Sequence, residues 1–172
     1  ISQSTKFYGP VHIVSDYTAG SNNPVFVADI DNDGYMDIVS VGIANDKNNW
    51  YKNNGESYPS FTRKPFSTWV YSVRDVLATD IDGDGDLDII TAACVTNNSI
   101  TWHENSGGSN PTWSSVVIGQ NANCAESIYA ADMDKDGDMD IVSASISDKT
   151  IAWYENDGSA NPSFNEADIY TN

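Results

Sequence analysis

Basic residues are scarce in this chain of 172 residues, which has eight Lys and Arg against 25 Asp and Glu and a formal net charge of -17. Such a chain has no basic stripe to neutralise phosphates, so we expect no nucleic-acid partner. No apolar run approaches the roughly 20 residues that a bilayer span needs. With 40% hydrophobic and 11% aromatic residues, the chain still has enough apolar side chains for a folded core.

Residues that carry common enzyme chemistry are equally scarce. The chain has two histidines, and His103 occupies the place that Tyr51 and Tyr154 hold in similar segments, which predicts a structural role. No Gly-x-Ser-x-Gly elbow, phosphate-binding glycine loop or histidine cluster is present in the sequence. Paired aspartates can hydrolyse glycosides, but most of the aspartates here belong to three loops and the others are scattered. We therefore expect no enzyme.

Three loops are crowded with aspartate, at positions one, three, five and nine, around a glycine at position six. This spacing describes an oxygen cage for a hard cation, and Ca²⁺ fits better than Mg²⁺, which prefers a strict octahedron and keeps more of its water. Ordinary polar turns are the alternative, but three loops that each concentrate four like charges favour a cation. We expect three Ca²⁺ sites and include position seven among the candidate ligands. The candidates are Asp29, Asp31, Asp33, Tyr35 and Asp37; Asp80, Asp82, Asp84, Asp86 and Asp88; and Asp132, Asp134, Asp136, Asp138 and Asp140.

The segments around these loops predict strands. An EF-hand would need a glutamate at position twelve and a helix on each side, but position twelve is Ser40, Thr91 or Ser143. Short apolar and β-branched runs flank each loop instead, which is typical of strands. Each loop is therefore expected to close a β-hairpin.

The loops belong to a longer repeat, because their first aspartates are 51 and 52 residues apart. A Trp-containing segment recurs at residues 49–55, 101–107 and 152–158, and a proline turn with an aromatic residue follows each. Each repeat then carries four short strands, which is typical of a β-propeller blade. The fold class is expected to be all-β, with Trp50, Trp102 and Trp153 between the blades as core.

The pattern Ala-Asp-x-Asp-x-Asp-Gly-x-x-Asp-Ile-Val and the tail Ile-x-Trp-Tyr-Glu-Asn-x-Gly resemble the FG-GAP and VCBS-type repeats of integrin-like and secreted β-propellers. The resemblance covers roughly residues 7–170. It implies that each aspartate loop joins the first two strands of a blade and binds Ca²⁺.

The blade count predicts that the array is incomplete. We expect an N-terminal segment at residues 1–23 with an extra strand at 7–14, then blades at 24–66, 67–118 and 119–172, the last two including their leading connections. Closed propellers have four to eight blades, so three need partners. The possibilities are a slice of a longer propeller, a ring of two copies, or a head-to-tail filament. Since the sequence opens at Ile1, we expect a processed protein or an excised segment.

Two cysteines and a few surface residues complete the candidate sites. Strand order places Cys94 and Cys124 on the face opposite the aspartate loops, which predicts a disulfide between blades, with two buried thiols as the alternative. Asn97 lies in an N-glycosylation sequon. Tyr17, Trp69 and Tyr71 lie in the connections between blades and are candidates for ligand binding.

These features predict an extracellular, calcium-stabilised structural or adhesion module that assembles with other copies or blades. One alternative is a lectin with glycan pockets in the connections at residues 17–23, 67–74 and 119–126. Another is an accessory domain of a secreted polysaccharide-degrading enzyme.

Overall fold

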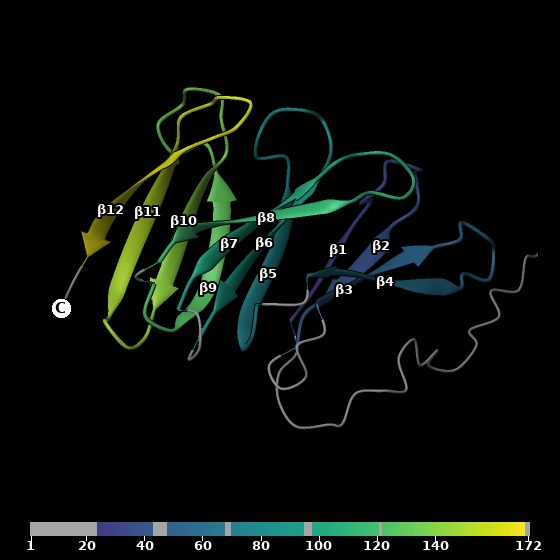
Figure 1. Ribbon diagram of the computed structural model, residues 1–172, viewed down its shortest axis with the longest axis horizontal. Helices are drawn as coiled ribbons and strands as arrows, with labels where there is room; N and C mark the ends of the chain where they lie inside the picture. Colours follow the sequence, from purple (N-terminus) through teal and green to yellow (C-terminus); the bar gives the residue numbers. More distant parts are fainter. Residues whose placement is uncertain (1–23, 43–47, 68–69, 95–97, 121, 171–172) are drawn as a thin grey trace, which may run out of the picture.

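The computed structural model describes residues 24–42, 48–67, 70–94, 98–120 and 122–170. This described part contains strands, turns and loops but no helix (Figure 1). The strands form three four-stranded sheets, each in chain order and antiparallel throughout. The all-β, three-sheet fold predicted from the sequence is therefore confirmed. The strand expected at residues 7–14 lies outside the described residues.

Each sheet runs from an inner first strand to an outer fourth strand. The strands are β1 (Val25–Ala28), β2 (Asp37–Ser40), β3 (Asn48–Asn53) and β4 (Phe61–Ser67); β5 (Val73–Thr79), β6 (Asp88–Ala93), β7 (Ile100–Asn105) and β8 (Trp113–Gly119); and β9 (Ala125–Ala131), β10 (Asp140–Ser145), β11 (Thr150–Asn156) and β12 (Phe164–Tyr170).

The aspartate loops join the first two strands of each sheet, as expected. In the first sheet Ala28 pairs with Asp37, and Thr79–Asp88 and Ala131–Asp140 are the equivalent pairs in the other sheets. The ninth aspartate of each loop is therefore the first residue of a strand. This register places its side chain in the sheet and not at the tip of the loop.

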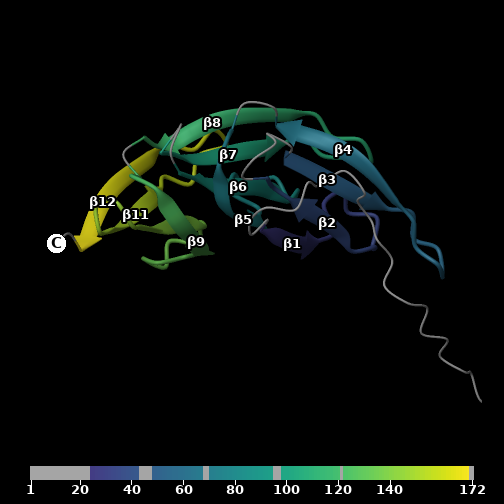
Figure 2. The ribbon, with the colours of Figure 1, turned by 90° about the horizontal axis from the view of Figure 1, so that it is seen from below.

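The sheets stand side by side in an arc, with β4, β8 and β12 along its convex side and β1, β5 and β9 along its concave side (Figure 2). One apolar core lies between the first two sheets and contains Trp50, and another lies between the second and third and contains Trp102. Both indoles are almost fully buried, at 1% and 3% exposure. Burial between sheets, which drives the association of blades, confirms the core role expected for these two tryptophans.

A disulfide joins the second and third sheets. Cys94 directly follows β6 and Cys124 directly precedes β9, and their sulfurs are bonded. Both residues lie at the ends of strands opposite the aspartate loops, as predicted. The bond therefore ties neighbouring sheets together at the end opposite the aspartate loops.

None of the described residues forms a helix of the length and apolarity that a membrane crossing would require.

Candidate metal-binding loops

The first aspartate of each loop shapes the turn. Asp29 accepts hydrogen bonds from the backbone N–H groups of Asp33, at 3.0 Å, and Gly34, at 2.7 Å. Asp80 accepts bonds from the N–H groups of Gly83, at position four, and Gly85, at position six, at 2.9 and 3.1 Å, and Asp132 accepts one from Lys135, at position four, at 2.7 Å. The glycine at position six has a φ of +89° to +106° in the three loops, a left-handed conformation that glycine adopts without steric cost. The backbone thus wraps around its own first carboxylate.

Carboxylates one, three and five converge in all three loops. In each, one oxygen from every member lies within 4.8 Å of the others. Hard oxygen donors at this spacing suit Ca²⁺ or Mg²⁺ and not a softer transition metal. In the first loop the Oδ1 atom of Asp31 is buried without a hydrogen-bond partner, whereas its Oδ2 atom contacts Lys52. The converging residues fit a cation, and they are Asp29, Asp31 and Asp33; Asp80, Asp82 and Asp84; and Asp132, Asp134 and Asp136.

The ninth aspartate of each loop is not among these converging carboxylates. Its side chain accepts hydrogen bonds from backbone N–H groups instead. Asp37 accepts the N–H groups of Ile30 at 3.3 Å and Asn53 at 2.7 Å, and the indole N–H of Trp50 at 2.9 Å. Asp88 and Asp140 accept the two equivalent backbone bonds, and all three aspartates are at most 1% exposed. This carboxylate therefore ties the loop to the third strand of its own sheet, a role that the spacing alone did not indicate.

The seventh residues turn towards the neighbouring loop. A Cβ atom added to Gly55, Gly107 or Gly158 would collide with the side chain of Tyr35, Asp86 or Asp138, respectively. Each of these side chains therefore covers a glycine in the connection between the third and fourth strands. Only glycine leaves room for this contact, and each of the three also has a positive φ.

The electrostatic environment differs between the first loop and the second. The Lys52 ammonium contacts Asp31 and lies 2.7 Å from Asp33 Oδ2, and its hydrogen bond is the main cause that lowers the pKa of Asp33. In the second loop burial raises the pKa of Asp82, and the charges of Asp84, Asp80 and Glu104 raise it further. Burial likewise raises the pKa of Asp88 to about 7. Burial therefore disfavours the ionised form of Asp82 and Asp88, whereas Lys52 favours the ionised form of Asp33.

An asparagine on the third strand clamps the loop of the preceding sheet. Asn105 Nδ2 donates to the carbonyl of Ile30 at 3.0 Å, and Asn156 Nδ2 donates to that of Ile81 at 2.8 Å. Each amide also bonds its own loop, through the carbonyls of Leu87 and Met139. Sequence reasoning missed this role, although the recurrence of asparagine in every Trp-containing segment was a usable signal.

Comparison with protein families adds to this geometry. The model of the FG-GAP-like repeat matches residues 29–91 and 80–143, together more than half of the chain. The chain belongs to the FG-GAP-like repeat family. Such repeats build structural or adhesion-type β-propeller modules, often bind calcium and are generally non-catalytic. A comparison with curated proteins found no significant match.

His103 has a structural environment in the second FG-GAP-like sheet. It is fully buried, and its ring nitrogens lie 3.0 Å from Thr91 Oγ1 and 2.8 Å from Ser115 Oγ. Phe66 of the first sheet meets the imidazole edge-on at a centroid distance of 5.2 Å. Burial lowers the His103 pKa to about 3, so the ring is neutral and packs between sheets.

The surface candidates remain predictions. Tyr17, Trp69 and Asn97 lie outside the described residues. Tyr71 is described, is 37% exposed and lies two residues before β5. Its exposure is compatible with ligand binding but does not identify a ligand.

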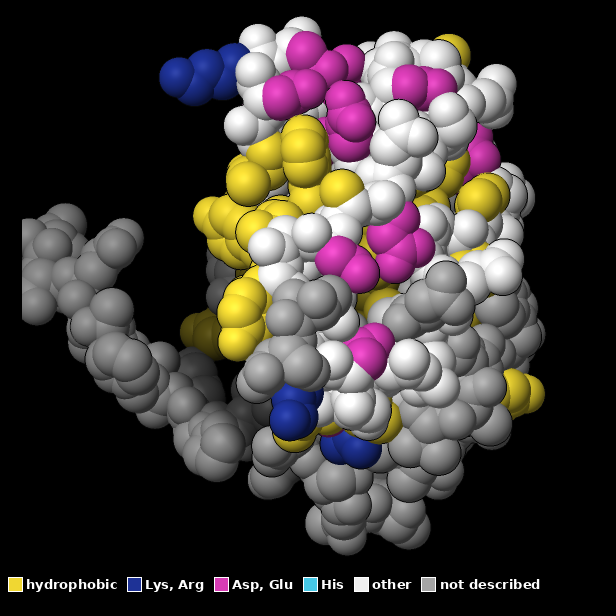
Figure 3. Space-filling model, turned by 90° about the vertical axis from the view of Figure 1, so that its left-hand side faces the viewer, with side chains coloured by type: hydrophobic (Ala, Val, Ile, Leu, Met, Phe, Trp, Pro, Cys, Tyr) yellow, Lys and Arg dark blue, Asp and Glu magenta, His cyan; other side chains and the backbone are white. Residues whose placement is uncertain are grey.

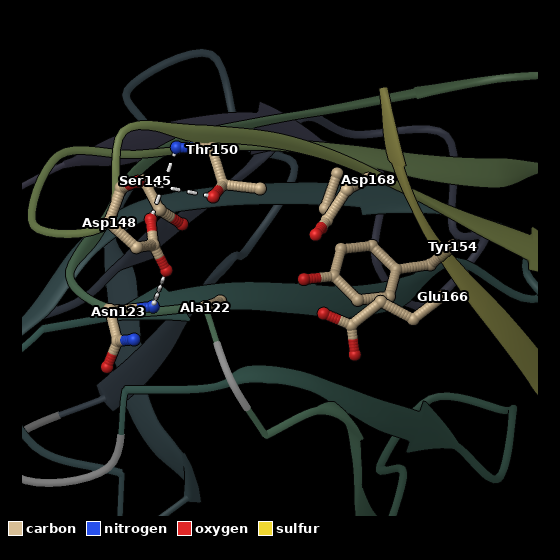
Figure 4. A pocket seen from close by; sticks show the side chains of 9 residues that line it. Ala122, Asn123, Ser145, Asp148, Thr150, Tyr154, Glu166 and Asp168 are labelled. Carbon is tan, nitrogen blue, oxygen red and sulfur yellow. Dashed lines mark hydrogen bonds between the residues drawn. The ribbon is translucent and has the colours of Figure 1, made fainter. Parts of the chain in front are cut away.

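An acidic cavity of about 440 Å³ lies against the third FG-GAP-like sheet (Figure 4). Asp148, Glu166 and Asp168 line it, and the Tyr154 hydroxyl points into it (Figure 4). The Asp148 carboxylate accepts hydrogen bonds from the backbone N–H groups of Asn123 and Thr150, at 3.1 and 3.2 Å. Burial and then the charges of Asp168 and Asp148 raise the pKa of Glu166. Tyr154 is fully buried, so its ring offers no exposed face on which a sugar could stack.

Proposed function

We propose that this FG-GAP-like chain is an extracellular, calcium-stabilised and non-catalytic module of structural or adhesive type. It assembles with further blades of the same kind, supplied by other copies or by a longer chain. The observation that carries the proposal is the exposed outer face of the third sheet, which repeats a face that the first two sheets bury.

Equivalent residues form this face in each sheet. Leu77, Ile90 and Trp102 are neighbours across the second sheet and are buried against the third. Tyr129, Val142 and Trp153 occupy the same row of the third sheet. The side chains of Leu77 and Tyr129 are 8% and 72% exposed, respectively. The third sheet therefore exposes the face that the second sheet buries, and no sheet among the described residues lies against it.

The surrounding surface has the mixed character of an interaction site. Figure 3 views the end of the molecule where the third sheet lies, and it shows hydrophobic side chains gathered over the middle with acidic ones above and among them. Ile151, which lies two residues before Trp153 on the same strand and is 41% exposed, adds to the apolar area. Contiguous exposed apolar area of this kind marks binding surfaces in soluble proteins.

A polar feature supports a blade as the occupant. Ile30 is the second residue of the first loop, and Ile81 is the second residue of the second loop. The backbone carbonyl of each accepts a hydrogen bond from an asparagine of the following sheet. The equivalent residue of the third loop is Met133, which has no following sheet within the described part of the chain. In another copy the matching asparagine would be Asn53, which already bonds the Met36 carbonyl as Asn105 bonds Leu87.

Calcium and an extracellular location are supported by the loops and by the disulfide. Three carboxylates that converge without a cation repel one another, so binding energy from Ca²⁺ would become folding energy. Millimolar Ca²⁺ outside cells fills sites of modest affinity. Disulfides persist in oxidising compartments, and both the Cys94–Cys124 bond and FG-GAP-like repeats are typical of extracellular proteins.

The test is the mass of the purified chain by light scattering, as a function of protein concentration, in about 1 mM Ca²⁺ and in EDTA. We expect assemblies in Ca²⁺ that EDTA dissociates. Tyr129→Lys, which places a charge on the exposed face, should prevent assembly. Ile146→Lys is the matched control, because Ile146 is 64% exposed in the turn after β10 and not on this face.

Two outcomes would contradict the proposal. A chain that stays monomeric at every concentration in Ca²⁺ would exclude self-assembly through this face. Assembly and thermal unfolding that are both unchanged in EDTA would exclude a stabilising role for calcium.

A further inference from the structure

The three repeats differ at one residue of the third strand. This residue directly precedes the clamping asparagine. This residue is Lys52 in the first sheet, Glu104 in the second and Glu155 in the third. The exchange reverses the charge beside an otherwise repeated carboxylate cluster. The three loops therefore differ in the charge that a bound cation would meet.

Lys52 reaches into the first cluster. Its ammonium contacts Asp31, whose side chain has no exposed surface, and it lies 2.7 Å from Asp33, whose side chain is 30% exposed. Both aspartates belong to the three carboxylates that converge in this loop. One ammonium thus contacts two of the three carboxylates that converge in this loop.

The positive charge of Lys52 substitutes for part of what a metal supplies. An ammonium donates up to three hydrogen bonds, and pairing with a buried carboxylate is much less screened than pairing at the surface. A Ca²⁺ ion at the same oxygens would have to displace Lys52 or lie next to its charge, and like charges a few ångströms apart repel. Calcium would therefore compete with a group of the chain itself in this loop.

The other two loops have the opposite balance. Glu104 accepts a hydrogen bond from Ser114 Oγ at 2.5 Å, and its charge acts on Asp82 of the second loop. Position seven adds a further carboxylate in these loops, where the first loop has Tyr35. Counting the loop acids with the third-strand residue, the first loop has four carboxylates and Lys52, the second has six carboxylates, and the third has six carboxylates and Lys135.

We propose that Lys52 is the resident cation of the first loop, so that the chain binds two Ca²⁺ ions, in the second and third loops, and not three. This inference rests on the proposed calcium role and restricts it to two of the three repeats. The first sheet then keeps its loop closed without metal, whereas the second and third loops depend on Ca²⁺. Removal of calcium would loosen one end of the array and leave the other folded.

The experiment is a calcium titration of the metal-free chain by isothermal titration calorimetry, with the bound ions counted by equilibrium dialysis. Wild type should bind two ions per chain. Lys52→Glu, which copies the residue of the other two repeats, should bind three. Lys149→Glu makes the same charge change in the exposed turn between β10 and β11, far from the loops, and should still bind two.

A second variant protects the test against misfolding of Lys52→Glu. Glu104→Lys copies the first repeat into the second and should reduce the stoichiometry from two to one. Circular dichroism establishes that each variant is folded in Ca²⁺.

The outcomes are distinct. Three ions bound by wild type, or two bound by a folded Lys52→Glu chain, would overturn the inference and leave the proposed calcium role intact. No ion bound by wild type would overturn the calcium role together with the inference.

Discussion

The second and third sheets present the same row of residues to different surroundings. Trp102 lies with Leu77 and Ile90 in the core between the second and third sheets. Trp153, at the same place in the third sheet, is only partly buried, and Tyr129 in the same row is 72% exposed. The repeated sequence therefore gives each sheet the same apolar face. Whether this face is buried depends on the presence of a neighbouring sheet.

The largest expected contrast comes from truncating these two tryptophans. Trp102→Ala should lower the free energy of unfolding by about 3–5 kcal/mol, because it opens a cavity between packed sheets. Trp153→Ala should cost about 1 kcal/mol, because a part-exposed side chain loses less buried area. Urea unfolding in Ca²⁺, at low protein concentration so that assembly does not cover Trp153, measures both.

Equal losses for the two variants would show that the third face is already covered in solution. If the loss for Trp153→Ala instead grows with protein concentration, the exposed face is the one that assembly buries.

The clamping asparagines give a second contrast. Asn156 bonds the Ile81 carbonyl of the second sheet as well as Met139 of its own. Asn156→Ala should cost about 1–3 kcal/mol, since it leaves buried carbonyl oxygens without donors. Asn53 bonds the exposed Met36 carbonyl, so Asn53→Ala should cost less than about 1 kcal/mol.

Hydrogen exchange distinguishes a clamp between sheets from a general loss of stability. Asn156→Ala should speed exchange in the second loop, residues 80–88, more than in the third. Asn156→Asp keeps an acceptor for the Gly158 N–H, which Asn156 Oδ1 accepts at 3.1 Å, but removes the donor, so it should have the same local effect. Uniformly faster exchange across both loops would contradict the clamp.

Much of the fold could be predicted because each element has a local signal. The loop spacing, the short apolar runs and the paired cysteines each act within one repeat or between adjacent repeats, and the hairpins and the disulfide followed from them. The roles of individual side chains depended on register and contact. Four aspartates in a loop are equal in the sequence, yet pairing with Ala28 turns Asp37 inwards. The reach of Asn105 to Ile30, 75 residues away, depends on how the sheets pack, which no local pattern specifies.

The smallest contrast concerns one position of the third strand, which is His103 in the second sheet and Tyr154 in the third. Tyr154, whose pKa burial raises to about 12, stays neutral at ordinary pH. His103 holds the same position against the first sheet, and burial lowers its pKa from 6.5 to about 3. The unfolded chain therefore takes up a proton at His103 between these values and the folded chain does not, so stability falls as pH falls through this range.

From pH 8 to pH 6, proton uptake at His103 should cost about 0.8 kcal/mol of unfolding free energy, and His103→Gln should remove that part of the pH dependence. Urea unfolding of both proteins at the two pH values, in saturating Ca²⁺, measures the difference. All other ionisable groups are the same in both proteins, so their contributions cancel in the comparison. An identical pH dependence in the two would mean that His103 has the same pKa in the folded and in the unfolded chain. The imidazole would then be open to protonation and not a dry part of the core.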